Sequence, residues 1–204
     1  MAISINPTRM ELIKLKKRVK VAQRGHNLLK EKRDGLMKEF MAIIKQAKEL
    51  RETIEKKLGQ AFKSFIFASA DMRPEVMEET LAMPSKKIFL EGKIKNIMSV
   101  NIPQFEFKEQ GDYICYSLAS TSSEIDTALE IFSQSLVTII KLAQIEHSAR
   151  LLSWEIEKTR RRVNALEYVF IPEMKQSIKQ ITNKLDEQER SAFSSLMRIK
   201  ELTA

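Results

Sequence analysis

The chain has 204 residues, 30% of them charged, and contains only 5 Gly, 5 Pro and 1 Cys. Because residues that make turns are scarce, this length predicts one domain of long elements, at most with a small insert. Aromatic residues make up 7% of the chain, which is low for a compact globule and typical of long helices. The single cysteine, Cys115, excludes an internal disulfide and fits a reducing compartment.

The net charge of +8 is concentrated in one segment, Arg9–Arg33, where ten basic residues face only Glu11 and Glu31. The ten are Arg9, Lys14, Lys16, Lys17, Arg18, Lys20, Arg24, Lys30, Lys32 and Arg33. Ten minus two equals the whole excess, so the rest of the chain is balanced. This electropositive segment is expected either to meet an acidic or carbonyl-rich surface or to stay solvated.

Neither a secretory signal nor a membrane span is expected. Met1–Lys17 lacks the apolar core of a signal peptide, and the apolar stretch Ser135–Ile145 is interrupted by Lys141. We therefore expect a soluble protein without direct membrane insertion, whose link to a membrane passes through a partner.

An N-terminal coiled-coil helix is predicted over 1–70. Either Asn6-Pro7 or the capping box of Thr8 and Glu11 marks its start. Apolar residues then recur in steps of three and four, a heptad pattern that predicts supercoiling with one partner helix. The seam reads Leu12, Leu15, Val19, Ala22, His26, Leu29, Arg33, Leu36, Phe40, Ile43, Ala47, Leu50, Ile54, Leu58, Ala61, Phe65 and Ala68.

A C-terminal coiled-coil helix is predicted over 121–204, starting at a capping box of Thr121 and Glu124. Pro172 removes a backbone N–H and is expected to bend this helix. Its seam reads Ile125, Leu129, Phe132, Leu136, Ile139, Leu142, Ile145, Ala149, Leu152, Ile156, Thr159, Val163, Leu166, Phe170, Met174, Ile178, Ile181, Leu185, Gln188, Ala192, Leu196 and Ile199. The heptad slips near Ile54–Leu58, Ile139–Leu142 and Phe170–Met174, which alters the local winding.

Neither helix can bury its apolar stripe alone, so the two are expected to pair antiparallel, with the insert at the end far from the termini. The fold class is then mainly α, a long antiparallel two-helix coiled coil with a small mixed helix and β-hairpin insert over 71–120. Its central seam residues are Leu36, Phe40, Ile43, Leu50, Ile156, Val163 and Leu166. In the insert, Pro74–Ala82 predicts a short helix. Lys86–Leu90, Lys93–Ile102 and Tyr113–Leu118, broken by Gly92 and Gly111, predict a hairpin or a three-stranded patch.

The sequence carries no pattern typical of a catalytic, cofactor-binding or metal site. His26 and His147 have no cysteine or carboxylate cluster at ligand spacing, and no glycine-rich phosphate loop is present. His26 and Arg33 interrupt an apolar seam, which favours either control of the helix register or a contact to another protein. Arg160, Arg161 and Arg162 form a basic cluster that is either a solvated face or a grip on a neighbouring subunit or a nucleic acid.

A basic coiled coil has three candidate uses. It could bind nucleic acid through phosphates, but no stacking surface or known nucleic-acid module accompanies the charge. It could lie on an anionic membrane, but its apolar stripes are needed for helix pairing. A structural part in a protein assembly fits best, and a basic nucleic-acid-binding coiled coil is the alternative.

Three collinear motifs resemble the D subunit of V/A-type rotary ATPases over nearly the whole chain. They are Ile5–Leu12 (INPTRMEL) with Arg24–Lys30 (RGHNLLK), Asn96–Val100 (NIMSV) followed by Pro103, and Glu155–Tyr168 (EIEKTRRRVNALEY) followed by Ile171-Pro172. Gly35 departs from the expected pattern, and Met72–Lys95 and Gln104–Leu118 have no match. The end of the chain soon after the last helix suggests a bacterial or archaeal complex.

The resemblance implies a non-catalytic central-stalk rotor subunit without a cofactor. In the family, three A and three B subunits form a ring that binds ATP, and the D and F subunits fill its bore. The funnel-shaped C or d subunit joins the stalk to a membrane ring that carries protons or sodium, on the cytoplasmic face. Rotation couples ATP hydrolysis or synthesis to ion transport, and no nucleic acid is involved. The candidate ring contacts are Arg9, Lys14, Lys17, Arg24, Arg160, Arg161 and Arg162.

Overall fold

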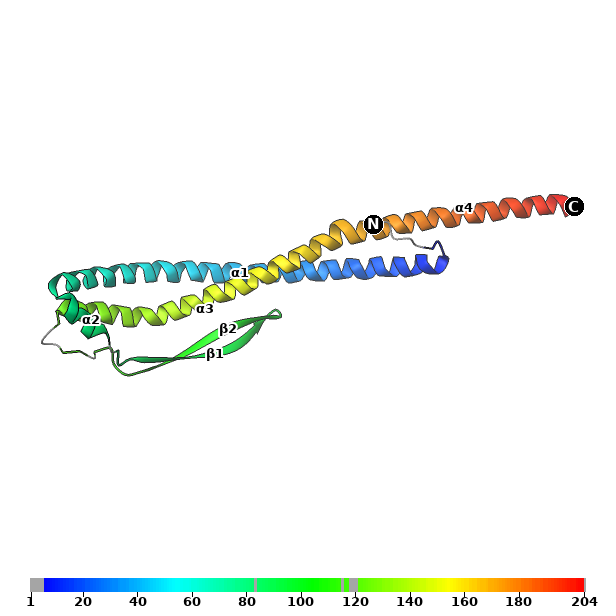
Figure 1. The fold of residues 1–204 in the computed structure, drawn as a ribbon. Coiled ribbons are helices and arrows are strands. Elements are labelled where there is room, and N and C mark those ends of the chain that lie inside the picture. The colour runs from blue at the N-terminus through cyan, green and yellow to red at the C-terminus, as the bar shows by residue number, and fades with distance from the viewer. Residues whose placement is uncertain (1–5, 83, 115, 118–120, 204) are drawn as a thin grey trace. The chain divides into compact units, whose positions relative to one another are not determined.

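The computed structural model describes residues 6–82, 84–114, 116–117 and 121–203. The chain is 79% helical, with a long N-terminal helix, a long C-terminal helical stretch and a two-stranded antiparallel hairpin between them, which confirms the predicted fold class. Cys115, and Leu118 at the end of the third predicted strand segment, lie outside the described residues. The elements are α1 (Arg9–Asp71), α2 (Pro74–Ala82), β1 (Lys87–Ile97), β2 (Val100–Gln110), α3 (Ser123–Ala165), the π-helical turn η1 (Leu166–Phe170) and α4 (Ile171–Thr203) (Figure 1).

The chain divides into two compact units. Unit 1 comprises Met1–Gly35 and Ile156–Ala204, and unit 2 comprises Leu36–Glu155. The division falls within α1 and within α3, so each unit holds one part of the N-terminal helix and one part of the C-terminal helical stretch.

In unit 1 the two helical segments run antiparallel. Arg9 forms an ion pair with Glu189, and further along α1 the His26 Nε2 atom lies 3.3 Å from Glu167 Oε2. Residue numbers rise on one helix as they fall on the other, which is the antiparallel order. Seam side chains are buried from both segments, Leu15, Val19, Val163 and Ile181 among them.

In unit 2 the helices α1 and α3 also pair antiparallel. The rings of Phe62 and Phe132 meet edge to face with centroids 5.4 Å apart, and Arg51 bonds Glu146 at 2.6 Å. Small residues are fully buried on both helices, which brings the backbones close. They are Ala61, Ala68, Ala128 and Ser135.

The predicted short helix α2 packs on this pair. Its Met77 is buried with Ala68 and Ile125, and Phe65 and Tyr116 cover the cluster. The bounds Pro74–Ala82 agree with the sequence prediction.

The start of α1 agrees with the predicted capping box, whereas the start of α3 does not. The Glu11 backbone N–H donates to Thr8 Oγ1 at 3.2 Å, so Thr8 caps α1 as the capping box predicts. The second helix starts later than predicted, because Ser122 accepts from the Glu124 N–H at 3.4 Å and α3 begins at Ser123. The Thr121 hydroxyl instead donates to the Ser117 carbonyl.

Pro172 acts through the turn that precedes it. The Ile171 N–H bonds the Leu166 carbonyl, an i to i−5 bond that makes Leu166–Phe170 one π-helical turn. The widened turn holds one extra residue and lies directly before Pro172, where the sequence predicts a bend. The extra residue turns the helix face by about 100°, which gives a physical cause for the seam slip at Phe170–Met174.

The hairpin turns at Met98–Ser99, where both residues have positive φ, of 49° and 71°. Gly92 therefore lies within β1, opposite Phe105, and does not separate two strands as predicted. The predicted strand Lys93–Ile102 contains the turn, and the described residues of the predicted strand Tyr113–Leu118 adopt no strand. Strand β2 ends at Gln110, and Gly111 follows it with a φ of 92°. A Cβ at Gly111 would lie 2.6 Å from the Ser85 carbonyl oxygen, so this position excludes a side chain.

Candidate interaction surfaces

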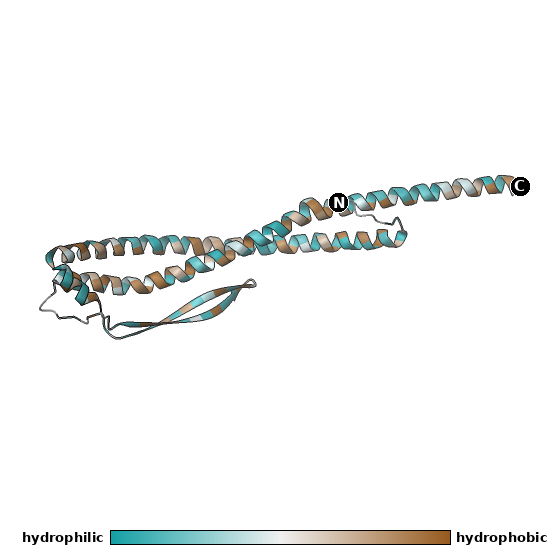
Figure 2. Cartoon of the chain, in the orientation of Figure 1, coloured by the Kyte–Doolittle hydropathy of each residue, from teal (hydrophilic) through white to brown (hydrophobic). Residues whose placement is uncertain are grey.

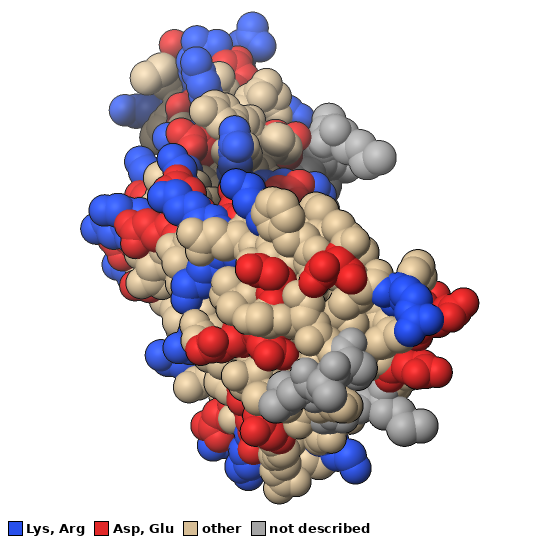
Figure 3. All heavy atoms as spheres, turned by 90° about the vertical axis from the view of Figure 1, so that its left-hand side faces the viewer, with Lys and Arg blue, Asp and Glu red and all other residues tan. Residues whose placement is uncertain are grey.

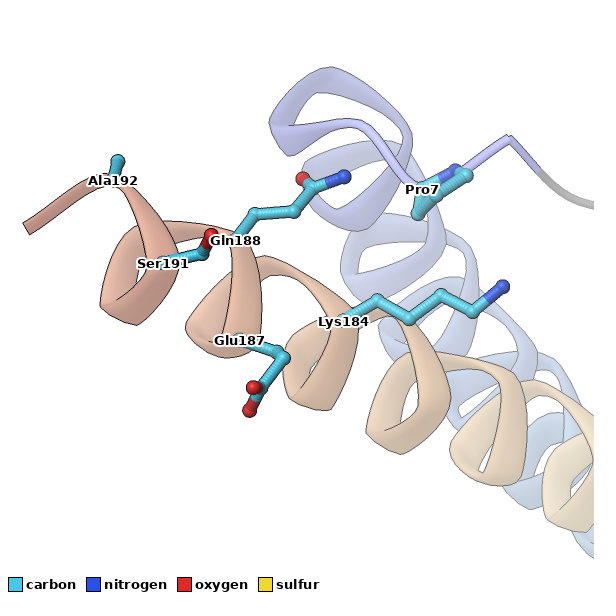
Figure 4. A pocket seen from close by; sticks show the side chains of 6 residues that line it. All are labelled: Pro7, Lys184, Glu187, Gln188, Ser191 and Ala192. Carbon is cyan, nitrogen blue, oxygen red and sulfur yellow. The ribbon is translucent and has the colours of Figure 1, made fainter. Parts of the chain in front are cut away.

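The described residues hold no group of three or more His, Cys, Asp or Glu side chains that could bind a metal ion. In unit 1 a shallow pocket of about 620 Å³ lies between Pro7 and α4 (Figure 4). Glu187 points away from Pro7 and pairs with Arg190. The hydrogen bond with Glu187 and the negative charge of Glu187 raise the pKa of Arg190. Because the Glu187 carboxylate is held in an ion pair, with only Lys184 and Gln188 as its polar neighbours in the pocket, these residues do not form a site for acid–base catalysis.

A second cavity, of about 260 Å³, lies in unit 2 under the hairpin tip. Its lining is aliphatic apart from five polar side chains, Gln46, Lys95, Gln104, Gln144 and Ser148. The Ser148 hydroxyl donates to the Gln144 carbonyl at 2.7 Å and is not paired with a base, so this cavity offers hydrogen bonds but no activated nucleophile.

Unit 1 carries an exposed basic surface, defined here as Arg9, Lys14, Lys17, Arg24, Arg160, Arg161 and Arg162. All seven residues are exposed. Three have acidic neighbours: Arg9 pairs with Glu189, Arg161 with Glu157, and Lys14 approaches Glu11 at 3.8 Å. Exposed pairs of this kind stabilise the fold little, so most of the charge remains available to a partner.

The end of α4 exposes apolar side chains over more than half of its circumference, which the seam prediction did not foresee. Ile181 is the last buried residue of α4, and every described residue from 189 to 203 is exposed. Among the described residues of unit 1, the predicted seam positions Ala192, Leu196 and Ile199 therefore have no partner helix. Apolar residues are interspersed along α4 to its end (Figure 2). Five of them are each more than half exposed: Phe193, Leu196, Met197, Ile199 and Leu202.

The π-helical turn presents three consecutive apolar residues to solvent, Tyr168, Val169 and Phe170. On the same turn Glu167 contacts the half-buried His26 at 3.3 Å. The polar interruption of the seam at His26 thus has a partner within unit 1. Arg33, the second interruption, bonds its neighbour Asp34 at 2.7 Å. No signal in the sequence marked the exposed triplet, because it depends on the widened turn.

The insert side of unit 2 is acidic. Figure 3 shows acidic side chains gathered around an uncharged surface on this face. In unit 2, exposed Glu75 and Glu124 lie in the first turns of α2 and α3, where the helix dipole favours negative charge. Glu78, Glu79 and Glu130 are further exposed acidic residues of these two helices.

The predicted seam residues are buried to different degrees. Leu36, Ile156 and Val163 are buried, and the others, Phe40, Ile43, Leu50 and Leu166, are half-buried. In a pair of only two helices, seam residues remain accessible to solvent from the sides of the pair, which accounts for the partial burial.

The helical stretch Ser123–Thr203 contains one window that is long and apolar enough to cross a membrane, with a mean hydropathy of 1.3. This result rests on length and composition, and it corrects the expectation that no stretch is sufficiently apolar. Within α3, the ring of Phe132 packs edge to face on Phe62 of α1.

Comparison with known proteins identifies the family. The family model for the D subunit of ATP synthase matches residues 11–201. The V-type ATP synthase D subunit of Clostridium botulinum (strain ATCC 19397 / Type A) is 49% identical over 207 residues, covering 99% of this chain and 96% of that protein. The protein of the same name from Thermoanaerobacter sp. (strain X514) is 50% identical over 202 residues, covering 98% and 97%. The chain belongs to the D-subunit family of V-type ATP synthases.

Proposed function

We propose that this chain is the central-stalk rotor subunit of its complex, a non-catalytic shaft that couples ATP hydrolysis or synthesis to ion transport. The observation that carries the proposal is the end of α4, where exposed apolar side chains cover more than half of the helix circumference. Such a helix in water needs cover from another protein. The bore of a ring of A and B subunits supplies that cover, and ATP chemistry stays at the interfaces of the ring.

The basic surface supports the same placement. It lies on unit 1, the unit that contains the α4 end, so both features enter the bore together in this proposal. Long-range attraction between the basic surface and a carbonyl-rich or acidic inner wall speeds docking and weakens with salt. Single exposed pairs contribute only about 0.2–1 kcal/mol each, so many weak contacts guide the shaft without locking it.

The insert is proposed to face the rest of the rotor. The acidic residues around an uncharged surface in unit 2 are complementary to a partner surface that has an apolar centre and basic residues at its edge. The funnel-shaped C or d subunit, which leads to the membrane rotor ring, is the proposed occupant, with the F subunit bound elsewhere on the stalk. In this arrangement the chain itself does not enter the membrane, and the complex holds it on the cytoplasmic face.

Asymmetry makes the transfer of torque physically reasonable. A two-helix cross-section is not round, so ring interfaces that open and close in turn push on different sides of it. Buried seam residues, Leu36 in unit 2 and Ile156 and Val163 in unit 1, resist twisting of the helix pair within each unit. The family assignment disfavours the alternative of a nucleic-acid-binding coiled coil.

The test is assembly of the tagged chain with A and B subunits, measured as the rate of ring binding against salt concentration. The variant replaces four basic-surface residues by Gln: Arg9, Lys14, Lys17 and Arg24. We expect slower association and a flatter salt dependence, with the helical circular dichroism unchanged. The matched control replaces Lys38, Lys45, Lys48 and Lys56 of unit 2 by Gln and keeps the wild-type rate. Failure of the wild-type chain to bind the ring refutes the rotor assignment, and equal rates for both quadruple variants refute the guiding role of the basic surface.

A further inference from the structure

The hairpin leaves one strand edge open. All residues of β1 from Lys87 to Asn96 are exposed, whereas β2 carries the buried residues Val100 and Ile102. The outer edge of β2 is already used, because the Phe105 N–H donates to Gln144 Oε1 of α3 at 2.9 Å. Strand β1 therefore lies on the outside of unit 2.

Two residues of β2 show which residue pairs of the hairpin are hydrogen-bonded to each other and which are not. Phe105 directs its N–H to α3, away from β1, and Pro103 has no N–H to give to the ladder. Both therefore occupy positions that make no bonds between the strands, and so do their partners Gly92 and Ile94. The alternation then directs the backbone N–H and C=O groups of five β1 residues outward: Ile88, Leu90, Gly92, Ile94 and Asn96.

The side chains of these positions are mostly apolar and exposed. Ile88 is 39% exposed, Leu90 53% and Ile94 78%. Gly92 lies between them, and a Cβ added there would meet no atom within 4 Å. The result is a notch opposite Phe105, flanked by aliphatic side chains.

The other face of β1 is charged and partly neutralised within the hairpin. Lys93 pairs with Glu106 at 2.7 Å, and Glu91 pairs with Lys108 at 3.1 Å. Among the described residues Lys87 and Lys95 have no ion pair, so a positive charge stands free near each end of the strand.

The hairpin is also held in place, which makes the edge a firm template. At its base the Lys86 ammonium bonds Ser133 of α3 at 2.6 Å and Glu109 at 2.7 Å. At its tip Ile102 is buried and Gln144 bonds Phe105. A strand of eleven residues without proline or a bulge, open along its edge, is a site for pairing with another chain.

We propose that the outer edge of β1 accepts an extended strand from another subunit of the assembled complex. The added strand carries apolar residues against Ile88, Leu90 and Ile94, a large side chain in the Gly92 notch, and carboxylates near Lys87 and Lys95. This mode of binding gives affinity through backbone hydrogen bonds and specificity through alternate side chains. A second copy of this chain fits less well, because β1 carries three lysines and one glutamate and two copies repel. The inference rests on the proposed function, since the donor of the strand is a component of that complex.

Hydrogen exchange with residue resolution tests the pairing, in the isolated chain and in the purified complex. In the complex we expect the amides of Leu90, Gly92 and Ile94 to exchange about tenfold more slowly or better, while the ladder amides of Glu91 and Lys93 change little. Equal protection of both sets, or no protection, overturns the inference while the complex itself stands. Protection that depends on the concentration of the isolated chain identifies a second copy as the occupant and also overturns it. A chain that joins no complex overturns both this inference and the proposed function.

Two variants separate the backbone from the side chain. Ile94→Pro removes an outward N–H without a loss to the hairpin ladder, as Pro103 does on the facing strand, and Ile94→Ala removes only the side chain. We expect the proline variant to dissociate from the complex about tenfold faster than the alanine variant. Gly92→Val fills the notch, favours the strand and is expected to weaken retention as well. Equal retention of Ile94→Pro and Ile94→Ala, with ladder amides still protected, refutes strand addition.

Discussion

Leucine truncation at two positions of α1 measures how much the seam stabilises the chain. Leu36 is 0% exposed, whereas Leu28 on the same helix is 66% exposed. Truncation of a fully buried leucine to alanine costs about 2–5 kcal/mol, because transfer energy and a cavity add. At an exposed helix site the same change alters stability by about 0.5 kcal/mol or less, and alanine is the better helix former. Leu36→Ala is therefore expected to lose at least about 1.5 kcal/mol more than Leu28→Ala.

Urea unfolding of the isolated chain, followed by helical circular dichroism, provides the measurement. The chemistry of the two substitutions is identical, so the difference between their midpoints reports burial alone. We expect the midpoint for Leu28→Ala to coincide with wild type and that for Leu36→Ala to fall, with similar slopes. Coincident midpoints for the two variants would show that the seam at Leu36 does not stabilise the fold.

Three further predictions concern the helices. Gly25→Ala and Gly59→Ala each raise the free energy of unfolding by up to about 1 kcal/mol, because no atom lies within 4 Å of an added Cβ; a fall in the urea midpoint contradicts this. Ala68→Leu overpacks a fully buried site and is expected to lower stability by about 1–3 kcal/mol, whereas Ala70→Leu at an exposed site leaves the melting temperature unchanged. Equal shifts in melting temperature for the two variants contradict close packing at Ala68. Pro172→Ala restores a backbone N–H and stabilises the isolated chain by up to about 3 kcal/mol, and an unchanged or lower urea midpoint contradicts the cost assigned to the proline.

The long helices could be predicted from the sequence because apolar residues spaced three and four apart are typical of a coiled-coil helix. Thr8 with Glu11 located the start of α1, and Pro74 and Pro84 bounded α2. The start of α3 was missed by two residues, since Thr121 and Ser122 are both good caps and tertiary packing chooses between them.

The hairpin turn could not be predicted from composition. A glycine is the usual residue at positive φ, yet Met98 and Ser99 adopt it here. The Asn96 side chain accounts for this, because its Oδ1 accepts from the Ser99 N–H at 3.1 Å and its amide donates to Asn101 at 2.8 Å. Asn96 and Asn101 face each other only after the register is set, so the signal is visible in the fold and not in the local sequence.

The end of α4 carries the plainest consequence for assembly. The heptad continues through Leu196 and Ile199 with the same spacing that buries Ile181, yet the described partner helix α1 begins at Arg9, which pairs with Glu189. Periodicity reports that a helix face is apolar and does not report which protein covers it. A face covered within the chain stabilises the fold, whereas a face covered by a partner stabilises the complex. Truncation of exposed Leu196 to alanine should therefore leave the urea midpoint of the isolated chain unchanged and weaken its retention in the ring. A lower midpoint with unchanged retention would place the cover of this face within the chain itself and remove the main support for the rotor placement.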